Sequence, residues 1–193
     1  PAPYLELCAG GAQEAMGGAA VADRNDPACG FWNPAGLSGL RGFQIESQYT
    51  FLSQNQILSY MAFANGFRDR FFYGLTVFYY SAGNDIEARS GPSLNPDSVF
   101  GDTEMTFMPS LTFRLSPRWS IGGNLKIQFQ DFSTFSGFGI GEDLGLQYRV
   151  TNSTTLGLMI QDPLSVFNYS NSSQALVPPT FKAGIDGHDE SLS

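Results

Sequence analysis

The stretch from Trp119 to Gln130 alternates between two chemically different sets of side chains. One alternate set is apolar and includes Trp119, Leu125 and Ile127, whereas the other is polar and includes Lys126 and Gln130. A period of two indicates a β-strand with one apolar and one polar face. Strands in soluble proteins average about 5–6 residues, but a tilted strand needs about 9–11 to cross a bilayer. The length of this run therefore favours a membrane-crossing strand.

The same alternation recurs along the chain after residue 41. We predict strands near 42–51, 56–64, 70–80, 103–115, 119–130, 139–150, 154–161 and 180–186. Their connections mostly alternate between short and long, which is typical of a meander in a membrane barrel. Pro109 lacks an amide donor and predicts a bulge or a sheet edge. The predicted fold class is all-β, an antiparallel up-and-down transmembrane β-barrel with about eight strands in this chain.

The polar faces of these strands do not resemble the surface of a soluble protein. They carry Gln, Asn, Ser, Thr and Gly with isolated charges rather than dense Lys and Glu. We therefore expect the apolar faces to meet lipid and the polar faces to line a lumen. The residues expected to face the lumen are Glu46, Arg114, Lys126, Gln128 and Arg149. In a wet lumen, replacing Lys126 by leucine would cost little stability. A soluble β-barrel binding protein, with the faces inverted, is an alternative.

Composition excludes several classes of function. A net charge of −8 with only ten Lys and Arg argues against a nucleic-acid partner. The sequence contains no run of about 18 apolar residues, so it predicts no membrane-spanning helix. The single histidine, His188, lies in an acidic tail, and no zinc spacing or nucleophile motif occurs. We expect no catalytic residue, metal or cofactor, and therefore no enzyme.

Residues 1–41 differ from the rest, because they are rich in Gly and Ala and show little alternation. They predict a compact irregular segment with a short helix near 13–15. The chain opens without a basic, apolar signal region, as expected of a mature or trimmed chain. Cys8 and Cys29 could form one disulfide or remain two thiols, since spacing alone does not decide the pairing.

Two motifs in this segment carry a resemblance to a known family. The first is Ala15, Met16, Gly17, Gly18 and Ala19, followed by an acidic stretch over 23–26, and the second is Asn33, Pro34, Ala35, Gly36 and Leu37. Together they resemble the start of the PorV/PorQ-type outer-membrane barrel family. The Asn-Pro-Ala element also resembles the hatch of the more distant FadL-type long-chain fatty-acid transporters.

The resemblance implies a division into a hatch or plug at 1–41, including Met16, Gly17 and Gly18, and barrel strands and loops at 42–193. It makes Asn33, Pro34, Ala35, Gly36 and Leu37 the expected anchor of the plug to the barrel wall. An eight-stranded barrel is just wide enough for its own side chains and cannot also hold a plug. We therefore expect part of a larger barrel, with a closed eight-stranded barrel and an external N-terminal segment as the alternative.

The resemblance also implies a function. A PorV-like protein would be a non-enzymatic anchor or shuttle for surface or secreted proteins in the bacterial outer membrane, whereas a FadL-like protein would transport hydrophobic or small molecules. The expected partners are outer-membrane lipid, lipopolysaccharide and other chains of a surface or secretion assembly. Phe132, Phe135 and Phe138, expected in an outer loop, form a candidate contact patch or fold back into the barrel mouth.

Overall fold

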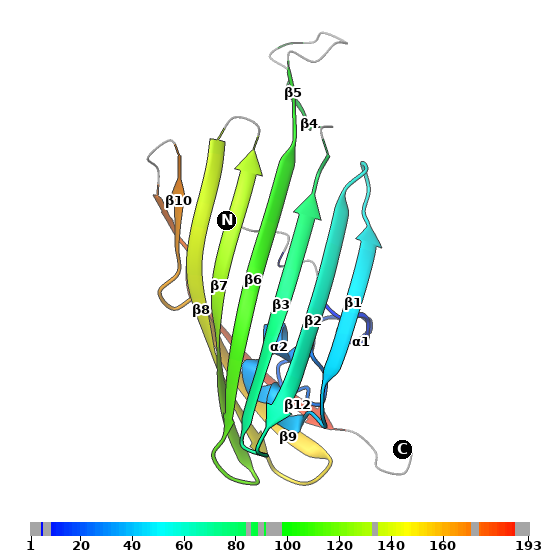
Figure 1. Cartoon of the computed structure of the whole chain (residues 1–193), viewed down its shortest axis with the longest axis vertical. Helices are drawn as coiled ribbons and strands as arrows, with labels where there is room; N and C mark the ends of the chain where they lie inside the picture. Colours follow the sequence, from blue (N-terminus) through cyan, green and yellow to red (C-terminus); the bar gives the residue numbers. More distant parts are fainter. Residues whose placement is uncertain are drawn as a thin grey trace.

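The computed structural model describes residues 5, 9–83, 86–88, 91, 98–132, 135–170 and 174–187, and within them ten strands form one antiparallel sheet. These strands are β1 (Gln44–Phe51), β2 (Ile57–Phe67), β3 (Phe71–Ser81), β6 (Asp102–Arg114), β7 (Trp119–Phe132), β8 (Phe135–Arg149), β9 (Thr154–Gln161), β10 (Val166–Tyr169), β11 (Gln174–Leu176) and β12 (Thr180–Gly187). Two further strands, β4 (Ile86–Ala88) and β5 (Ser98–Phe100), form a separate hairpin. This hairpin extends beyond the top of the sheet in Figure 1.

The sheet is a meander whose neighbouring strands mostly follow one another along the chain. Strands β1, β2, β3, β6, β7 and β8 pair in that order, and β8 then pairs with β10 along one part and with β9 along another. All eight predicted strands are confirmed. The short strands β10 and β11 lie in a segment that the sequence placed in a connection, because three or four residues are too few to show alternation.

The prediction of a bulge or an edge at Pro109 is wrong. Pro109 pairs with Leu75 of β3, and the register with β7 is the same on either side, with Phe107 opposite Ile127 and Ser110 opposite Asn124. The ladder to β7 is interrupted at Met108 and Pro109 without a shift in register. A central strand therefore accommodates the missing donor by losing local pairing with one neighbour.

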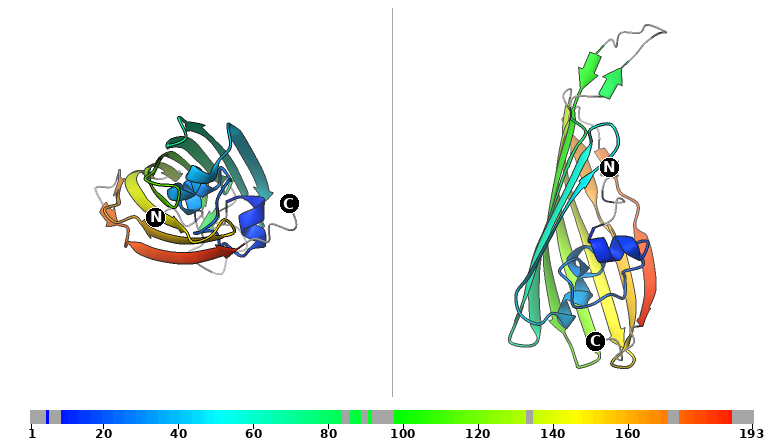
Figure 2. Two further views of the ribbon diagram at one scale, coloured as in Figure 1. Left: turned by 90° about the horizontal axis from the view of Figure 1, so that it is seen from below. Right: turned by 90° about the vertical axis from the view of Figure 1, so that its right-hand side faces the viewer.

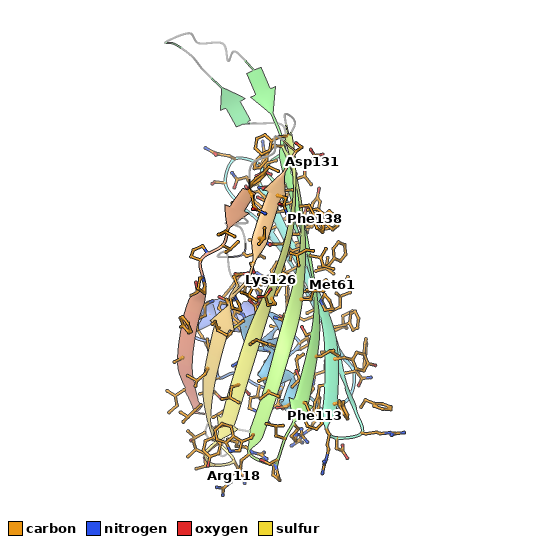
Figure 3. All side chains as sticks on the ribbon, turned by 90° about the vertical axis from the view of Figure 1, so that its left-hand side faces the viewer. Met61, Phe113, Arg118, Lys126, Asp131 and Phe138 are labelled. Atoms are coloured by element: carbon orange, nitrogen blue, oxygen red, sulfur yellow. The ribbon has the colours of Figure 1, made fainter. Side chains whose placement is uncertain are left out.

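The two faces of the sheet differ in chemistry. Large apolar side chains such as Ile121, Leu125 and Phe129 are exposed on the outer face, while Ser120, Lys126 and other polar residues are buried on the inner face. Figure 3 shows the side chains on both faces, with Lys126 about midway along the sheet. The alternative of a soluble barrel is wrong, because it required the apolar faces to meet in the interior.

The N-terminal segment lies on the inner side of the curled sheet (Figure 2). It contains α1 (Gly11–Ala15), α2 (Cys29–Trp32) and the 3-10 helix η2 (Pro34–Gly39). We call residues 9–41 the hatch. The alternative of a barrel with this segment outside is therefore wrong. No helix in the part of the chain that the structure describes is both long and apolar enough to span a membrane.

The sheet is open between β1 and β12. Among the described residues β1 pairs only with β2, and β12 only with β9. The hatch lies between these two edges, with α1 visible in the opening in Figure 2. It contacts both edges, since Gly10 N donates to Gln48 Oε1 of β1 at 3.0 Å and the Lys182 ammonium of β12 lies 5.7 Å from the centre of the Trp32 ring.

Candidate functional site

Asn33 holds the hatch together and joins it to the wall. Its side chain is fully buried, and its Nδ2 donates to Val21 O at 2.7 Å and to Leu158 O of β9 at 3.3 Å. Its Oδ1 accepts from Ala35 N at 3.1 Å, which caps η2. Since Pro34 occupies the first turn of η2, where a missing amide is harmless, the motif forms a short helix at a fixed position.

Side-chain hydroxyls on the wall donate hydrogen bonds to this motif. Thr112 Oγ1 of β6 donates to Pro34 O, and Ser120 Oγ of β7 donates to Ala35 O at 3.1 Å. The structure thus places Asn33, Pro34, Ala35, Gly36 and Leu37 against the wall, and their roles as an anchor and as a gate stay predictions.

Four inward-facing glycines, which were not among the site residues predicted from the sequence, make this close approach possible. Gly122 lies opposite Gly145, and Gly157 lies opposite Gly184, on four strands of the wall. A Cβ atom on Gly145 would stand 2.0 Å from Asn33 Oδ1, and one on Gly157 would stand 2.2 Å from the Val21 carbonyl oxygen. A glycine inside a strand can mark close approach of another backbone, so their positions in the predicted strands were an available signal.

Met16, Gly17 and Gly18 reverse the chain after α1. Gly17 and Gly18 both have positive φ, at 65° and 78°, and their amides donate to Glu14 O and Gln13 O at 2.9 Å. Two consecutive residues in this conformation favour glycine. The Met16 side chain is exposed and is not part of the docking surface.

Lys126 lies in a buried ion-pair network rather than in open water. Its ammonium is 2.8 Å from Asp143 Oδ1 on β8 and 2.7 Å from Asp162 Oδ1 after β9, with Lys126 4% and Asp143 0% exposed. Asn124 joins the network to the hatch, because its Nδ2 donates to Gly30 O at 2.6 Å and to Asp143 Oδ2 at 3.3 Å. We therefore expect leucine at Lys126 to be costly, in contrast to the expectation for a wet lumen, since it would leave two carboxylates without their cation.

The other residues expected to face the lumen also lie on the inner side. Gln128 is buried, and Glu46 on β1 is half-buried close to Asp26 of the hatch. Arg114 and Arg149 lie at the ends of β6 and β8 with the short turns, where Arg114 donates to Ser38 O and Arg149 to Pro117 O.

A second part of the wall is aromatic. Phe31 and Trp32 of α2 pack with Phe78 of β3, with ring centres 5.2 Å apart for Phe31–Trp32 and 5.1 Å for Phe31–Phe78. Tyr60 of β2 adds a ring 5.3 Å from Phe78, and Met108 closes the cluster. The inner surface therefore has an aromatic sector over β2, β3 and β6 beside the polar sector around Lys126.

The phenylalanine patch lies on strands rather than in a loop. Phe132 ends β7 and Phe135 begins β8, with ring centres 4.6 Å apart, while Phe138 packs 5.4 Å from Phe129 within the sheet. The expected outer loop over 131–138 is therefore wrong, since the β7–β8 hairpin extends through most of it. The patch's role as a contact surface stays a prediction.

Cys29 is a buried free thiol in the hatch. Its Sγ lies 3.4 Å from Asp23 O, and burial, followed by the negative charge of Asp23, raises the pKa of the thiol well above its usual value. Cys8 and His188 lie outside the described residues. In the described part of the chain, no group of three His, Cys, Asp or Glu side chains is placed to hold a metal ion.

Comparisons with known proteins support the fold. No protein-family model matches the sequence, and no characterised protein matches it by sequence. The structure resembles that of the TodX deltaS2S3 mutant monoaromatic hydrocarbon channel with a TM-score of 0.60 and 12% identity, over 95% of this chain and 67% of that chain. The likeness shows the fold alone, that of an antiparallel β-barrel, and the FadL and PorV resemblances both stay predictions.

Proposed function

We propose that the chain is an outer-membrane barrel protein that lets small hydrophobic molecules pass, with the hatch as a movable plug. The membrane placement is supported by the outer face, where large apolar side chains from β1 to β12 are exposed to the surroundings. Monomeric soluble proteins rarely expose contiguous apolar patches larger than a few hundred Å². A lipid environment accounts for this face without further partners.

The aromatic cluster at the hatch carries the proposal. Phe31 and Trp32 lie between the aromatic wall and the open side of the sheet, where Lys182 of β12 stacks on Trp32. If the hatch moves, the rings of Tyr60 and Phe78 become an apolar lining inside the barrel. Apolar cargo binds such surfaces through burial of its own apolar area. The structural neighbour is itself described as a monoaromatic hydrocarbon channel.

Beside the aromatic packing of Phe31 against Phe78, the hatch contacts the wall through local polar bonds, as a releasable plug would. Asn124, Thr112 and Ser120 each donate one side-chain hydrogen bond to a hatch carbonyl. Individual neutral hydrogen bonds contribute only about 0.5–1.5 kcal/mol net. We favour transport over the anchor or shuttle role implied by the PorV resemblance, because the structural neighbour is described as a channel.

A disulfide that locks the hatch to β12 tests this function. A Cβ atom on Gly184 would lie 3.3 Å from Val21 Cβ, close to the roughly 3.5–4.5 Å that disulfides span. Val21→Cys with Gly184→Cys, in a background with Cys8→Ser and Cys29→Ser, is produced in bacterial cells. The uptake of radiolabelled toluene is then measured before and after a reductant.

We expect oxidised cells to take up toluene several-fold more slowly than reduced cells. The matched control carries Gly184→Cys alone in the same background and should not respond to the reductant. If the verified disulfide leaves toluene uptake unchanged, the hatch is not a movable plug on the path of apolar molecules.

A further inference from the structure

Three arginines from distant parts of the chain converge between the hatch and the short turns. Arg24 of the hatch, Arg114 of β6 and Arg149 of β8 together line a basin of 1030 Å³ and a small adjoining cavity of 10 Å³. Arg41 and Arg68 also line the basin, so it holds five of the ten Lys and Arg of a chain with a net charge of −8. Its acidic lining residues are Asp23, Asp69 and Asp186.

Within the part of the chain that the structure describes, no carboxylate forms a salt bridge with the three converging guanidinium groups. The attraction of Asp186 for Arg24 and of Asp69 for Arg114 is weaker than the repulsion between the arginines. The salt bridges within 4.0 Å among the described residues both belong to Lys126. Arg114 and Arg149 each donate to one backbone carbonyl, although a guanidinium has five donors. Burial, followed by the positive charges of Arg149 and Arg114, lowers the pKa of Arg24. The cluster is therefore electrostatically unfavourable without a negative partner.

The small cavity contains unsatisfied polar groups. Arg24 Nε and Ser38 Oγ are buried without a hydrogen-bond partner, and the Ser38 residue is only 1% exposed. Both residues line this cavity together with Arg114, Arg149 and Thr155. Buried polar groups are nearly always paired, so an unpartnered arginine donor and hydroxyl beside two further guanidinium groups require an acceptor.

We propose that this cluster binds a phosphate group. The arginine fork matches phosphate oxygens and forms charge-assisted hydrogen bonds with them. A cavity of 10 Å³ has room for about one water-sized group, so it would accept one phosphate oxygen while the rest of the ligand occupies the basin. The phosphate comes either from the free anion or from the headgroup of a phospholipid at the end of the barrel with the short turns.

Inorganic phosphate provides the first test. It is titrated calorimetrically into the detergent-solubilised chain, with acetate as the carboxylate comparison. We expect Arg24→Gln and Arg149→Gln to weaken phosphate binding about tenfold or more, since each removes charge-assisted hydrogen bonds. Arg70→Gln is the matched control, because Arg70 is an exposed arginine near the same end that lines neither cavity.

Phospholipid vesicles separate the two sources. The Tm of each protein is compared in digalactosyldiacylglycerol vesicles, which carry no phosphate, with and without phosphatidylglycerol. A phosphatidylglycerol-dependent rise in the original protein and in Arg70→Gln, absent from Arg24→Gln and Arg149→Gln, identifies a headgroup even if inorganic phosphate gives no heat. The proposal is overturned if neither probe binds, if all four proteins respond alike, or if acetate binds as tightly as phosphate. Neither readout depends on toluene uptake, so this test is independent of the proposed transport function.

Discussion

Gly122 of β7 lies directly against the backbone of Ala35 in the hatch: a Cβ atom at Gly122 would stand 2.6 Å from the Ala35 amide nitrogen. The same Cβ atom would be 2.6 Å from the carbonyl carbon of Pro34. Both neighbours are backbone atoms of a helix that Asn33 caps, so they cannot move aside as a flexible side chain would. The fit of the hatch against the wall thus depends on the absence of a side chain at this position.

Gly122→Ala should therefore loosen the hatch. Inserting a methyl group into a packed interface costs about 1–3 kcal/mol, and here that strain falls on the contact between hatch and wall. Gly123→Ala is the matched control, because the contacts of its Cβ atom would be at an ordinary 3.4 Å or more. Unfolding by denaturant in micelles, together with limited proteolysis of residues 9–41, measures both effects. Equal stability of the two variants would contradict the docking geometry.

Lys126→Met should be strongly destabilising. It removes the cation from between Asp143 and Asp162, and breaking a buried pair by deleting one partner costs about 3–5 kcal/mol. Adding Asp143→Asn should restore part of the loss, because the fully buried carboxylate is then neutral. A double-mutant cycle from denaturant unfolding gives the coupling energy. A coupling near zero would mean that Lys126 is solvated, as the sequence alone suggested.

The sequence predicted the features that depend on neighbours along the chain. Alternation identified the eight long strands and the chemistry of their faces, and the Gly/Ala-rich composition separated the hatch. Features that depend on distant residues were missed. The bond between Lys126 and Asp162 joins residues 36 apart. Arg24, Arg114 and Arg149 converge only because the hatch folds against the ends of β6 and β8.

The contribution of Asp23 to the free energy of unfolding should fall as the pH rises from acid towards neutral. Burial raises the pKa of its carboxyl above the usual 3.8, Asp26 and Asp186 raise it further, and hydrogen bonds from Gln13 and the Arg24 amide oppose the shift. The folded chain thus holds this proton more tightly than the unfolded chain. The contribution of Asp23 is fully present below about pH 3.8 and is lost as the pH rises through the folded pKa.

Asp23→Asn isolates this contribution. The difference in unfolding free energy between the original protein and Asp23→Asn should decrease as the pH rises from about 3.5, by on the order of 1.4 kcal/mol per unit of pKa shift, and level off above the folded pKa. A difference that grows over that range would mean that the hydrogen bonds, rather than burial, dominate at Asp23. Denaturant titrations at several pH values provide the comparison.

Cys29 should report on movement of the hatch. Its thiol is buried and its pKa is raised well above the usual value, so the reactive thiolate is scarce in the docked state. In a Cys8→Ser background, maleimide should label Cys29 slowly in the original protein and faster in Gly122→Ala. Gly123→Ala should keep the slow rate. Rapid labelling in all three proteins would show that the hatch is not held as the structure describes.

Leu125 and Leu115 test whether the apolar outer face meets lipid. Both side chains are about half exposed, at 45% and 50%, but Leu125 lies in the middle of β7 whereas Leu115 follows the end of β6. In a bilayer, lysine costs about 2–4 kcal/mol at the midplane and about 0–1 near the interface. Leu125→Lys should therefore destabilise the protein in phosphatidylcholine vesicles by about 2–4 kcal/mol, whereas Leu115→Lys should cost only about 0–1 kcal/mol. In water the two positions would be equivalent, because neither lysine would be buried. Similar unfolding free energies for both variants in vesicles would place the outer face against solvent or protein instead of hydrocarbon.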